Sequence, residues 1–189
     1  LKLREKQNIL LLMPASRPQE LRYILPTFLK TAKKLQLRYP SLIVYIPSCR
    51  RVFDEKFRMG LEKYEIIGKV ISQQDDSELM PYVYSLAKLA LCKSGTVNME
   101  LALYGIPQII GYKVSRVTAF IAKRILNFKV RFISPVNLLM KKFIIPEFVQ
   151  KNFIEEKIFY KACRLLDLTS EKAKIKKGYA LLNKELGEE

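Results

Sequence analysis

The chain has 189 residues, of which 49% are hydrophobic and 28% are charged. This length suits one domain with a sizeable core, and the composition excludes a disordered chain. The 34 Lys and Arg against 18 Asp and Glu give a net charge of +16, which favours an anionic partner, either nucleic acid or an anionic membrane face. An AT-rich genome would also enrich Lys, Ile and Phe, and explains part of this excess.

The residue types exclude several kinds of chemistry. There is no histidine, so this segment carries no Ser-His-Asp triad, Cys-His pair or His-ligated zinc. The three cysteines, Cys49, Cys92 and Cys163, are far apart and lack CxxC spacing, which favours free thiols in a reducing compartment. No apolar run reaches the ~18 residues that a membrane span requires. Because the chain begins at Leu1 and an apolar run follows at once, we expect it to be the downstream part of a longer protein.

Short apolar runs alternate along the chain with segments of helical period. Pro26 lies inside the first helical pattern, where we expect a kink or two abutting helices. In chain order the pattern predicts a strand over 9–13, a helix over 21–35, a strand over 42–47, a helix over 52–64, a strand over 66–71, a helix over 79–86, a strand over 88–92, a helix over 97–104, a strand over 108–112, and helices over 115–128 and 155–182.

Strands that alternate with helices at these lengths predict a Rossmann-like α/β fold, a parallel sheet with helices on both faces and right-handed crossovers. We expect one domain over 1–189, with 154–189 as a helical tail. Ligands of such sheets bind outside the carboxyl ends of the strands, so the loops from strand to helix are where a site is expected.

One such loop carries Ser94, Gly95 and Thr96 where the fourth strand meets a helix. A small-residue turn and a helix start together suit a diphosphate, since the first N–H groups of a helix have no partner within it. Either hydroxyl would cap the helix or bind a phosphate oxygen. Glu100, one turn into the helix, would accept hydrogen bonds from sugar or ribose hydroxyls. An ordinary N-cap followed by a helical glutamate explains the same residues, and the loop taken alone favours that interpretation.

Two further loops are candidates. In the first, Ser16 followed by Glu20 is typical of a helix start, and the guanidinium of Arg17 suits phosphate, although a solvated arginine is as consistent. In the second, the Asn137 side chain would hydrogen-bond to a polar edge of a ligand. Glu147 and Gln150 are expected three residues apart on one helix face. A turn asparagine and a capped helix also explain the second loop, and composition alone favours that interpretation.

Six motifs follow one another along the chain: P-x-S-R-x-x-E at 14–20, S-G-T-x-x-x-E at 94–100, G-I-P-Q-I-I-G-Y-K at 105–113, T-A-F-I-A-K-R-I at 118–125, N-L-L at 137–139 and P-E-F-V-Q at 146–150. Taken in this order, they resemble the lipid-A-disaccharide synthase family over nearly the whole chain. The chain departs from the family pattern at two places: Ala15 stands where the family usually has Gly, and S-P-V-N at 134–137 stands where it has S-L-P-N.

The resemblance implies the C-terminal, donor-binding half of a GT-B glycosyltransferase. The implied reaction transfers diacylglucosamine from UDP-2,3-diacylglucosamine to a monosaccharide phospholipid, with inversion, in lipid A biosynthesis. Neither a metal nor a cofactor is implied. The general base would belong to an N-terminal half, so this chain alone is expected to bind UDP without turnover. The implied site has Ser94, Gly95 and Thr96 at the diphosphate, Glu100 at the ribose, Ser16, Arg17 and Asn137 near the donor, and Glu20, Tyr112, Glu147 and Gln150 as further donor or acceptor contacts.

A partner surface is expected on the basic amphipathic segment 115–128, where Lys123 and Arg124 flank an apolar stripe. It suits an anionic membrane surface, or packing on the sheet or the N-terminal half; homodimerisation is left open. The implied location is cytoplasmic, peripheral at the inner membrane face, or organellar in a plastid-bearing organism. Nucleic acid is not expected, because aromatic and basic residues are not interleaved.

The alternative functions are those of a non-catalytic basic Rossmann-like module and of another GT-B UDP-sugar enzyme, such as the glucosaminyl transferase of peptidoglycan synthesis or a UDP-sugar epimerase. The peptidoglycan enzyme would carry a glycine-rich turn at 93–96, where this chain has one glycine.

Overall fold

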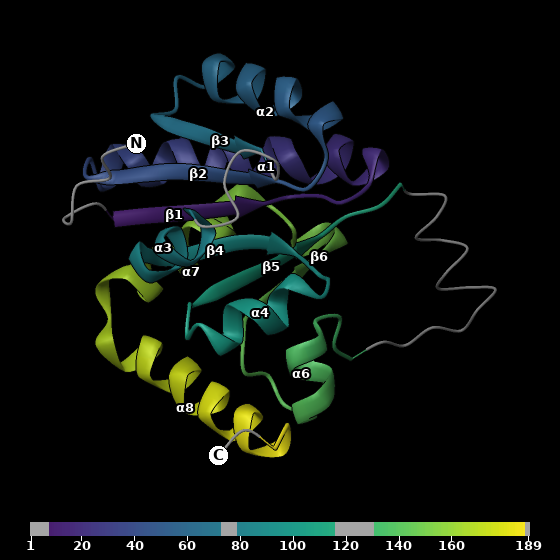
Figure 1. The fold of residues 1–189 in the computed structure, drawn as a ribbon, viewed down its shortest axis with the longest axis vertical. Coiled ribbons are helices and arrows are strands. Elements are labelled where there is room, and N and C mark those ends of the chain that lie inside the picture. The colour runs from purple at the N-terminus through teal and green to yellow at the C-terminus, as the bar shows by residue number, and fades with distance from the viewer. Residues whose placement is uncertain (1–7, 73–78, 116–130, 188–189) are drawn as a thin grey trace.

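A six-stranded, entirely parallel sheet forms the centre of the computed structural model, which describes residues 8–72, 79–115 and 131–187 (Figure 1). Its strand order is β3-β2-β1-β4-β5-β6, so the direction in which strands are added reverses between β1 and β4. The strands are β1 (Asn8–Met13), β2 (Leu42–Ser48), β3 (Gly68–Ser72), β4 (Ala87–Lys93), β5 (Gln108–Tyr112) and β6 (Glu147–Val149).

Helices cover both faces of this sheet (Figure 1). Helix α1 packs against α2 and α7 on one side, while α3 and α4 lie on the other, with α6 and α8 against α4. The helices are α1 (Pro18–Arg38), α2 (Arg51–Lys63), α3 (Leu79–Leu86), α4 (Val97–Leu103), α6 (Pro135–Met140), α7 (Glu155–Asp167) and α8 (Thr169–Glu185), with a 3-10 turn η1 (Gln150–Asn152).

The first five predicted strands are confirmed, but three expectations about the helices are wrong. The alternative of two abutting helices at Pro26 is wrong, because α1 continues through Pro26 as one helix. Pro26 and Arg22 face solvent, so the Arg22 carbonyl, which lacks an N–H donor from Pro26, can bind water. The single helix expected over 155–182 is two helices that meet at Leu168. Glu147 lies in strand β6 rather than on a helix, because it pairs with β5 opposite Ile110. The amphipathic helix expected over 115–128 falls almost wholly outside the described residues.

The core lies between the sheet and its helices. Residues 9–12 of β1 are completely buried, as expected for a central strand covered on both faces. At Gly111 in β5 a Cβ atom would lie 2.7 Å from Phe28 and still closer to Phe153, two rings in edge-to-face contact at 5.3 Å. The buried hydroxyl of Tyr179 in α8 donates to the carbonyl of Ile106, just before β5, over 3.0 Å. The C-terminal helices are therefore packed onto the body of the sheet.

Candidate functional site

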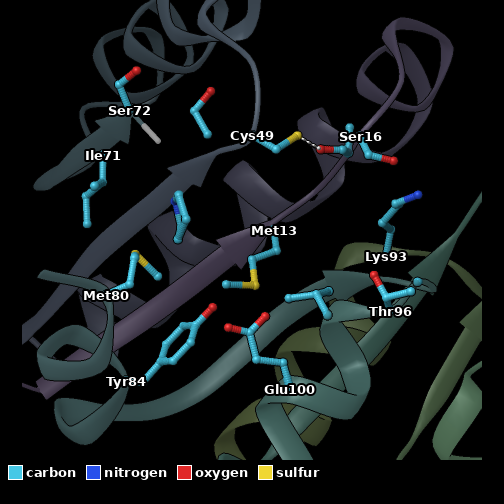
Figure 2. Close-up of a pocket in the computed structure, with 15 residues that line it drawn as sticks. Met13, Ser16, Cys49, Ile71, Ser72, Met80, Tyr84, Lys93, Thr96 and Glu100 are labelled. Carbon is cyan, nitrogen blue, oxygen red and sulfur yellow. Dashed lines mark hydrogen bonds between the residues drawn. The ribbon is translucent and has the colours of Figure 1, made fainter. Parts of the chain in front are cut away.

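A cleft of about 420 Å³ opens at the carboxyl ends of the central strands, where the order of the sheet reverses (Figure 2). This is the position at which open α/β sheets bind their ligands. One end of the cleft includes Ile71, Met80 and Ser72, and Met13 lies between the two ends (Figure 2). The other end is formed by the loop from β1 to α1 and the loop from β4 to α4, and it includes Ser16, Lys93, Gly95, Thr96 and Glu100.

The loop from β1 to α1 is organised by the carboxylate of Glu20. Its Oε2 accepts hydrogen bonds from the backbone N–H groups of Ser16 at 2.8 Å and Arg17 at 3.0 Å, which satisfies donors at the helix start. Burial raises the pKa of Glu20, but the hydrogen bonds from Ser16 and Lys93 outweigh it and hold that pKa below its usual value. The predicted helix start is confirmed. Arg17 is exposed and takes part in none of the ion pairs among the described residues.

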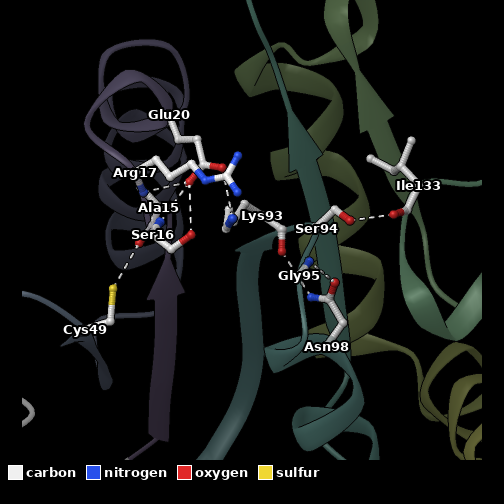
Figure 3. Close-up of polar contacts among 10 residues, drawn as sticks. All are labelled: Ala15, Ser16, Arg17, Glu20, Cys49, Lys93, Ser94, Gly95, Asn98 and Ile133. Carbon is white, nitrogen blue, oxygen red and sulfur yellow. Dashed lines mark hydrogen bonds and ion pairs between the residues drawn. The ribbon is translucent and has the colours of Figure 1, made fainter.

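The loop from β4 to α4 is held by Asn98, not by a hydroxyl cap. The Oδ1 of Asn98 accepts from the backbone N–H of Gly95 at 2.9 Å, and its Nδ2 donates to the carbonyl of Lys93 at 3.1 Å. Thr96 is the N-cap residue without a side-chain cap hydrogen bond, and Ser94 donates its hydroxyl to the carbonyl of Ile133 (Figure 3). The cap expected from Ser94 or Thr96 is therefore wrong, because the Ser94 hydroxyl is engaged with Ile133 and Thr96 makes no side-chain cap hydrogen bond; Asn98 instead holds the turn that precedes the helix.

Glu100 lies one turn into α4 and lines the cleft beside Tyr84. The two side chains point toward one another, phenol to carboxylate (Figure 2). Burial and the neighbouring Glu100 carboxylate raise the pKa of Tyr84, so this phenol stays protonated beside the carboxylate. Tyr84 is in turn held by Tyr104, whose ring lies edge-to-face with it at 4.9 Å. The carboxylate is thus aimed across the cleft and remains exposed to a ligand.

Asn137 and Glu147 belong to an internal network beside the cleft. The amide of Asn137 donates to the carbonyl of Ile145 and to Glu147, both at 2.8 Å, and accepts from the N–H groups of Ile144 and Ile145. Glu147 also accepts from Ile133 N at 2.8 Å and from the hydroxyl of Ser134 at 2.7 Å. Both side chains therefore hold the segment around α6 in place.

The remaining predicted contacts lie apart from the cleft. Tyr112 ends β5 and is half-buried, and Gln150 begins the turn η1 with φ of 50°, in the left-handed region. Neither residue lines the cleft, and neither do Asn137 and Glu147. In contrast, Ser16, Gly95, Thr96 and Glu100 are brought together there.

Several cleft residues were not predicted from the sequence. Lys93 directly precedes the Ser94-Gly95-Thr96 turn, and its position at the end of a strand was the available signal. Tyr84 and Met80 come from α3, whose short amphipathic pattern gave no indication that it would face the cleft. Cys49 follows β2 and lines the cleft, whereas its place in the sequence indicates only a free thiol.

Comparison with known proteins identifies the family. The family model described as lipid-A-disaccharide synthetase matches residues 1–189. The chain belongs to the lipid-A-disaccharide synthetase family. It is 46% identical over 185 residues to the lipid-A-disaccharide synthase of Prochlorococcus marinus, covering 98% of this chain and 47% of that relative. It is 34% identical over 182 residues to that of Gloeothece citriformis, covering 96% and 46%. The chain thus spans about half the length of the curated relatives that it matches.

Solved structures show how widely the fold of this lipid-A-disaccharide synthetase family member is shared. The glycosyltransferase WaaG, described as involved in lipopolysaccharide biosynthesis, has a TM-score of 0.60 and 15% identity over 95% of this chain and 44% of its own. The UDP-GlcNAc 2-epimerase of Neisseria meningitidis, bound to UDP-GlcNAc, has a TM-score of 0.60 and 13% identity over 99% and 46%. The expected Rossmann-like domain of the GT-B type is confirmed.

Proposed function

We propose that this chain is the donor-binding half of a lipid-A-disaccharide synthase. It binds UDP-2,3-diacylglucosamine for inverting transfer of the sugar to a lipid monosaccharide phosphate. The observation that carries the proposal is one cleft with two chemically different ends at the switch point of the sheet, in a chain of this family. Membership of the family favours this function over a nucleic-acid or surface-binding module and over another UDP-sugar enzyme.

The two ends of the cleft suit the two parts of a nucleotide sugar. The end with Ile71 and Met80 suits the uracil ring, and the exposed Glu100 carboxylate suits the ribose hydroxyls. The turn at Gly95 and Thr96 suits the diphosphate, with Arg17 exposed nearby on the facing loop. Ser94 and Asn137 support the site by holding its loops, since their polar atoms are engaged within the chain.

Inverting transfer needs a base for the acceptor hydroxyl and stabilisation of the charge on the departing UDP. The cleft offers the second of these. Its two carboxylates have other roles, because Glu20 is held by Ser16, Arg17 and Lys93, and Glu100 is assigned to the ribose hydroxyls. We therefore assign the base to an N-terminal half, and expect this chain alone to bind UDP without glycosyl transfer.

We further propose that the protein works at an anionic membrane surface, on the cytoplasmic side, which the α6 tip contacts. The α6 tip consists of Leu138, Leu139, Lys141, Lys142 and Phe143. Its three apolar side chains are 49%, 56% and 64% exposed, and Phe143 is braced against Phe132 at 4.7 Å. Segment 131–146 contains Arg131 and both lysines but no acidic residue. Exposed apolar groups among cations suit an interface of anionic lipid, where each nearby Lys or Arg contributes ~1 kcal/mol. No helix among the described residues is long and apolar enough to cross a bilayer.

The position of Cys49 allows a direct test of the site. Cys49 is exposed and lines the cleft, whereas Cys92 and Cys163 are buried. UDP is therefore expected to slow alkylation of Cys49 in the folded chain, while uridine slows it less and free phosphate slows it least. Peptide mapping of the alkylated sites measures each rate. Equal alkylation of Cys49 with and without saturating UDP would contradict a nucleotide site in this cleft.

A further inference from the structure

Lys93 is the last residue of β4 and lines the cleft between the two loops that form its polar end (Figure 3). Its side chain is only 16% exposed, and its ammonium lies 2.9 Å from Oε1 of Glu20, which is 14% exposed. A largely buried cation at the centre of a proposed anion site is of interest, because desolvation strengthens its interaction with a bound anion.

The contact with Glu20 uses only part of the hydrogen-bonding capacity of the Lys93 ammonium. An ammonium carries three N–H donors, and Glu20 accepts one of them. Glu20 itself is fixed independently of Lys93, since its other oxygen accepts from the backbone N–H groups of Ser16 and Arg17. Lys93 can therefore donate a further hydrogen bond to a ligand while Glu20 stays in position.

The neighbouring turn places Lys93 beside the proposed diphosphate. A Cβ atom added at Gly95 would lie 3.6 Å from Cε and 3.9 Å from Nζ of Lys93, so this ammonium lies alongside the turn. Two donors of the turn are already engaged within the chain, since the Ser94 hydroxyl donates to Ile133 and the Gly95 N–H donates to Asn98. These two engaged donors leave the Thr96 part of the turn to contact a diphosphate, and Lys93 is the adjacent cation that can neutralise its charge.

We propose that Lys93 binds the diphosphate of the donor and stabilises the charge on UDP as it leaves. With the site empty, its ammonium pairs with Glu20; with the donor bound, it donates to phosphate oxygens as well. This inference rests on the proposed function, because it assigns one residue of that same site.

The test compares uridine, UMP and UDP by titration calorimetry on the full chain and its Lys93→Met variant. Losing a hydrogen bond to a charged group predicts that UDP affinity falls about tenfold to a hundredfold, UMP affinity falls less, and uridine affinity stays unchanged. Lys93→Arg should retain most of the UDP affinity. Lys88→Met is the matched control, since Lys88 lies on the same strand, is exposed, and is absent from the cleft.

One further variant separates binding from folding. The double variant Glu20→Gln with Lys93→Met avoids a buried carboxylate without its cation, and it should show the same selective loss of UDP. Two results would overturn the assignment of Lys93 and leave the proposed function intact. One is an equal loss of affinity for uridine and UDP; the other is unchanged UDP affinity in both Lys93→Met and the double variant. Absence of UDP binding to the unaltered chain would overturn both.

Discussion

The hydroxyl of Ser94 donates a hydrogen bond to the backbone carbonyl of Ile133, a residue 39 positions further along the chain. The hydroxyl proton is thereby engaged within the protein. An ionised phosphate oxygen can only accept a hydrogen bond, so this hydroxyl has no donor left for a phosphate. The first residue of the Ser94-Gly95-Thr96 turn thus connects the cleft to the segment before α6. That segment is held in turn by Glu147, which accepts from Ile133 N at 2.8 Å.

This relationship gives different expectations for folding and for binding. Ser94→Ala should lower the free energy of unfolding by about 1 kcal/mol, the usual net contribution of one hydrogen bond. UDP affinity should change by less than about threefold, because the hydroxyl does not contact phosphate. Urea unfolding and calorimetry measure the two effects. A large loss of UDP affinity at unchanged stability would show that the hydroxyl binds the ligand directly.

Gly95→Ala should have the opposite result. Its Cβ atom would meet nothing nearer than 3.6 Å, so the fold accommodates it, and stability should be unchanged or slightly raised. The methyl group would however stand beside the Lys93 ammonium in the cleft and weaken UDP binding. Gly111→Ala is the control, because its Cβ would collide with Phe28 and Phe153 and cost about 1–3 kcal/mol of stability. Unimpaired UDP binding by Gly95→Ala would place the diphosphate elsewhere.

Glu100→Ala should weaken UDP much more than it weakens free pyrophosphate. The carboxylate is assigned to the ribose hydroxyls and repels phosphate, so only the nucleoside part should lose a partner. The loss of such a hydrogen bond corresponds to about 1.5–3 kcal/mol of binding free energy. Competition of both ligands against a fluorescent UDP derivative measures the difference. Equal weakening of UDP and pyrophosphate would show that Glu100 does not bind the ribose.

The α6 tip should govern binding to anionic vesicles. Leu139→Ser with Phe143→Ser should sharply reduce co-sedimentation with phosphatidylglycerol vesicles, and salt should release the unaltered chain because surface charges are screened. The matched control is Leu37→Ser with Met59→Ser, two side chains that are 70% and 58% exposed on other helices. Unchanged vesicle binding by both variants would mean that diffuse net charge attracts the chain, and equal losses would mean that exposed apolar side chains contribute wherever they lie. A change in oligomeric state without a change in vesicle binding would identify the tip as a contact between copies.

The sequence was most informative where a pattern is local. Continuous apolar runs predicted β1 to β5, because buried parallel strands must be apolar on both faces. The three-residue strand β6 was missed, since Glu147 and its neighbours are half-buried and too few to show a period. The loops that line the cleft were predicted by their place after strands. The partners of Asn137 and Glu147 were not, because each depends on residues that only the folded chain brings together.

The central claim is that UDP binds in the cleft at the ends of β1 and β4. Titration of UDP at low salt into the chain and into the same chain alkylated at Cys49 tests it most directly, since the label occupies that cleft. We predict that UDP binds the unlabelled chain and that labelling abolishes this binding without unfolding the protein. Binding that persists after labelling, or no binding by the unlabelled chain, would contradict the account.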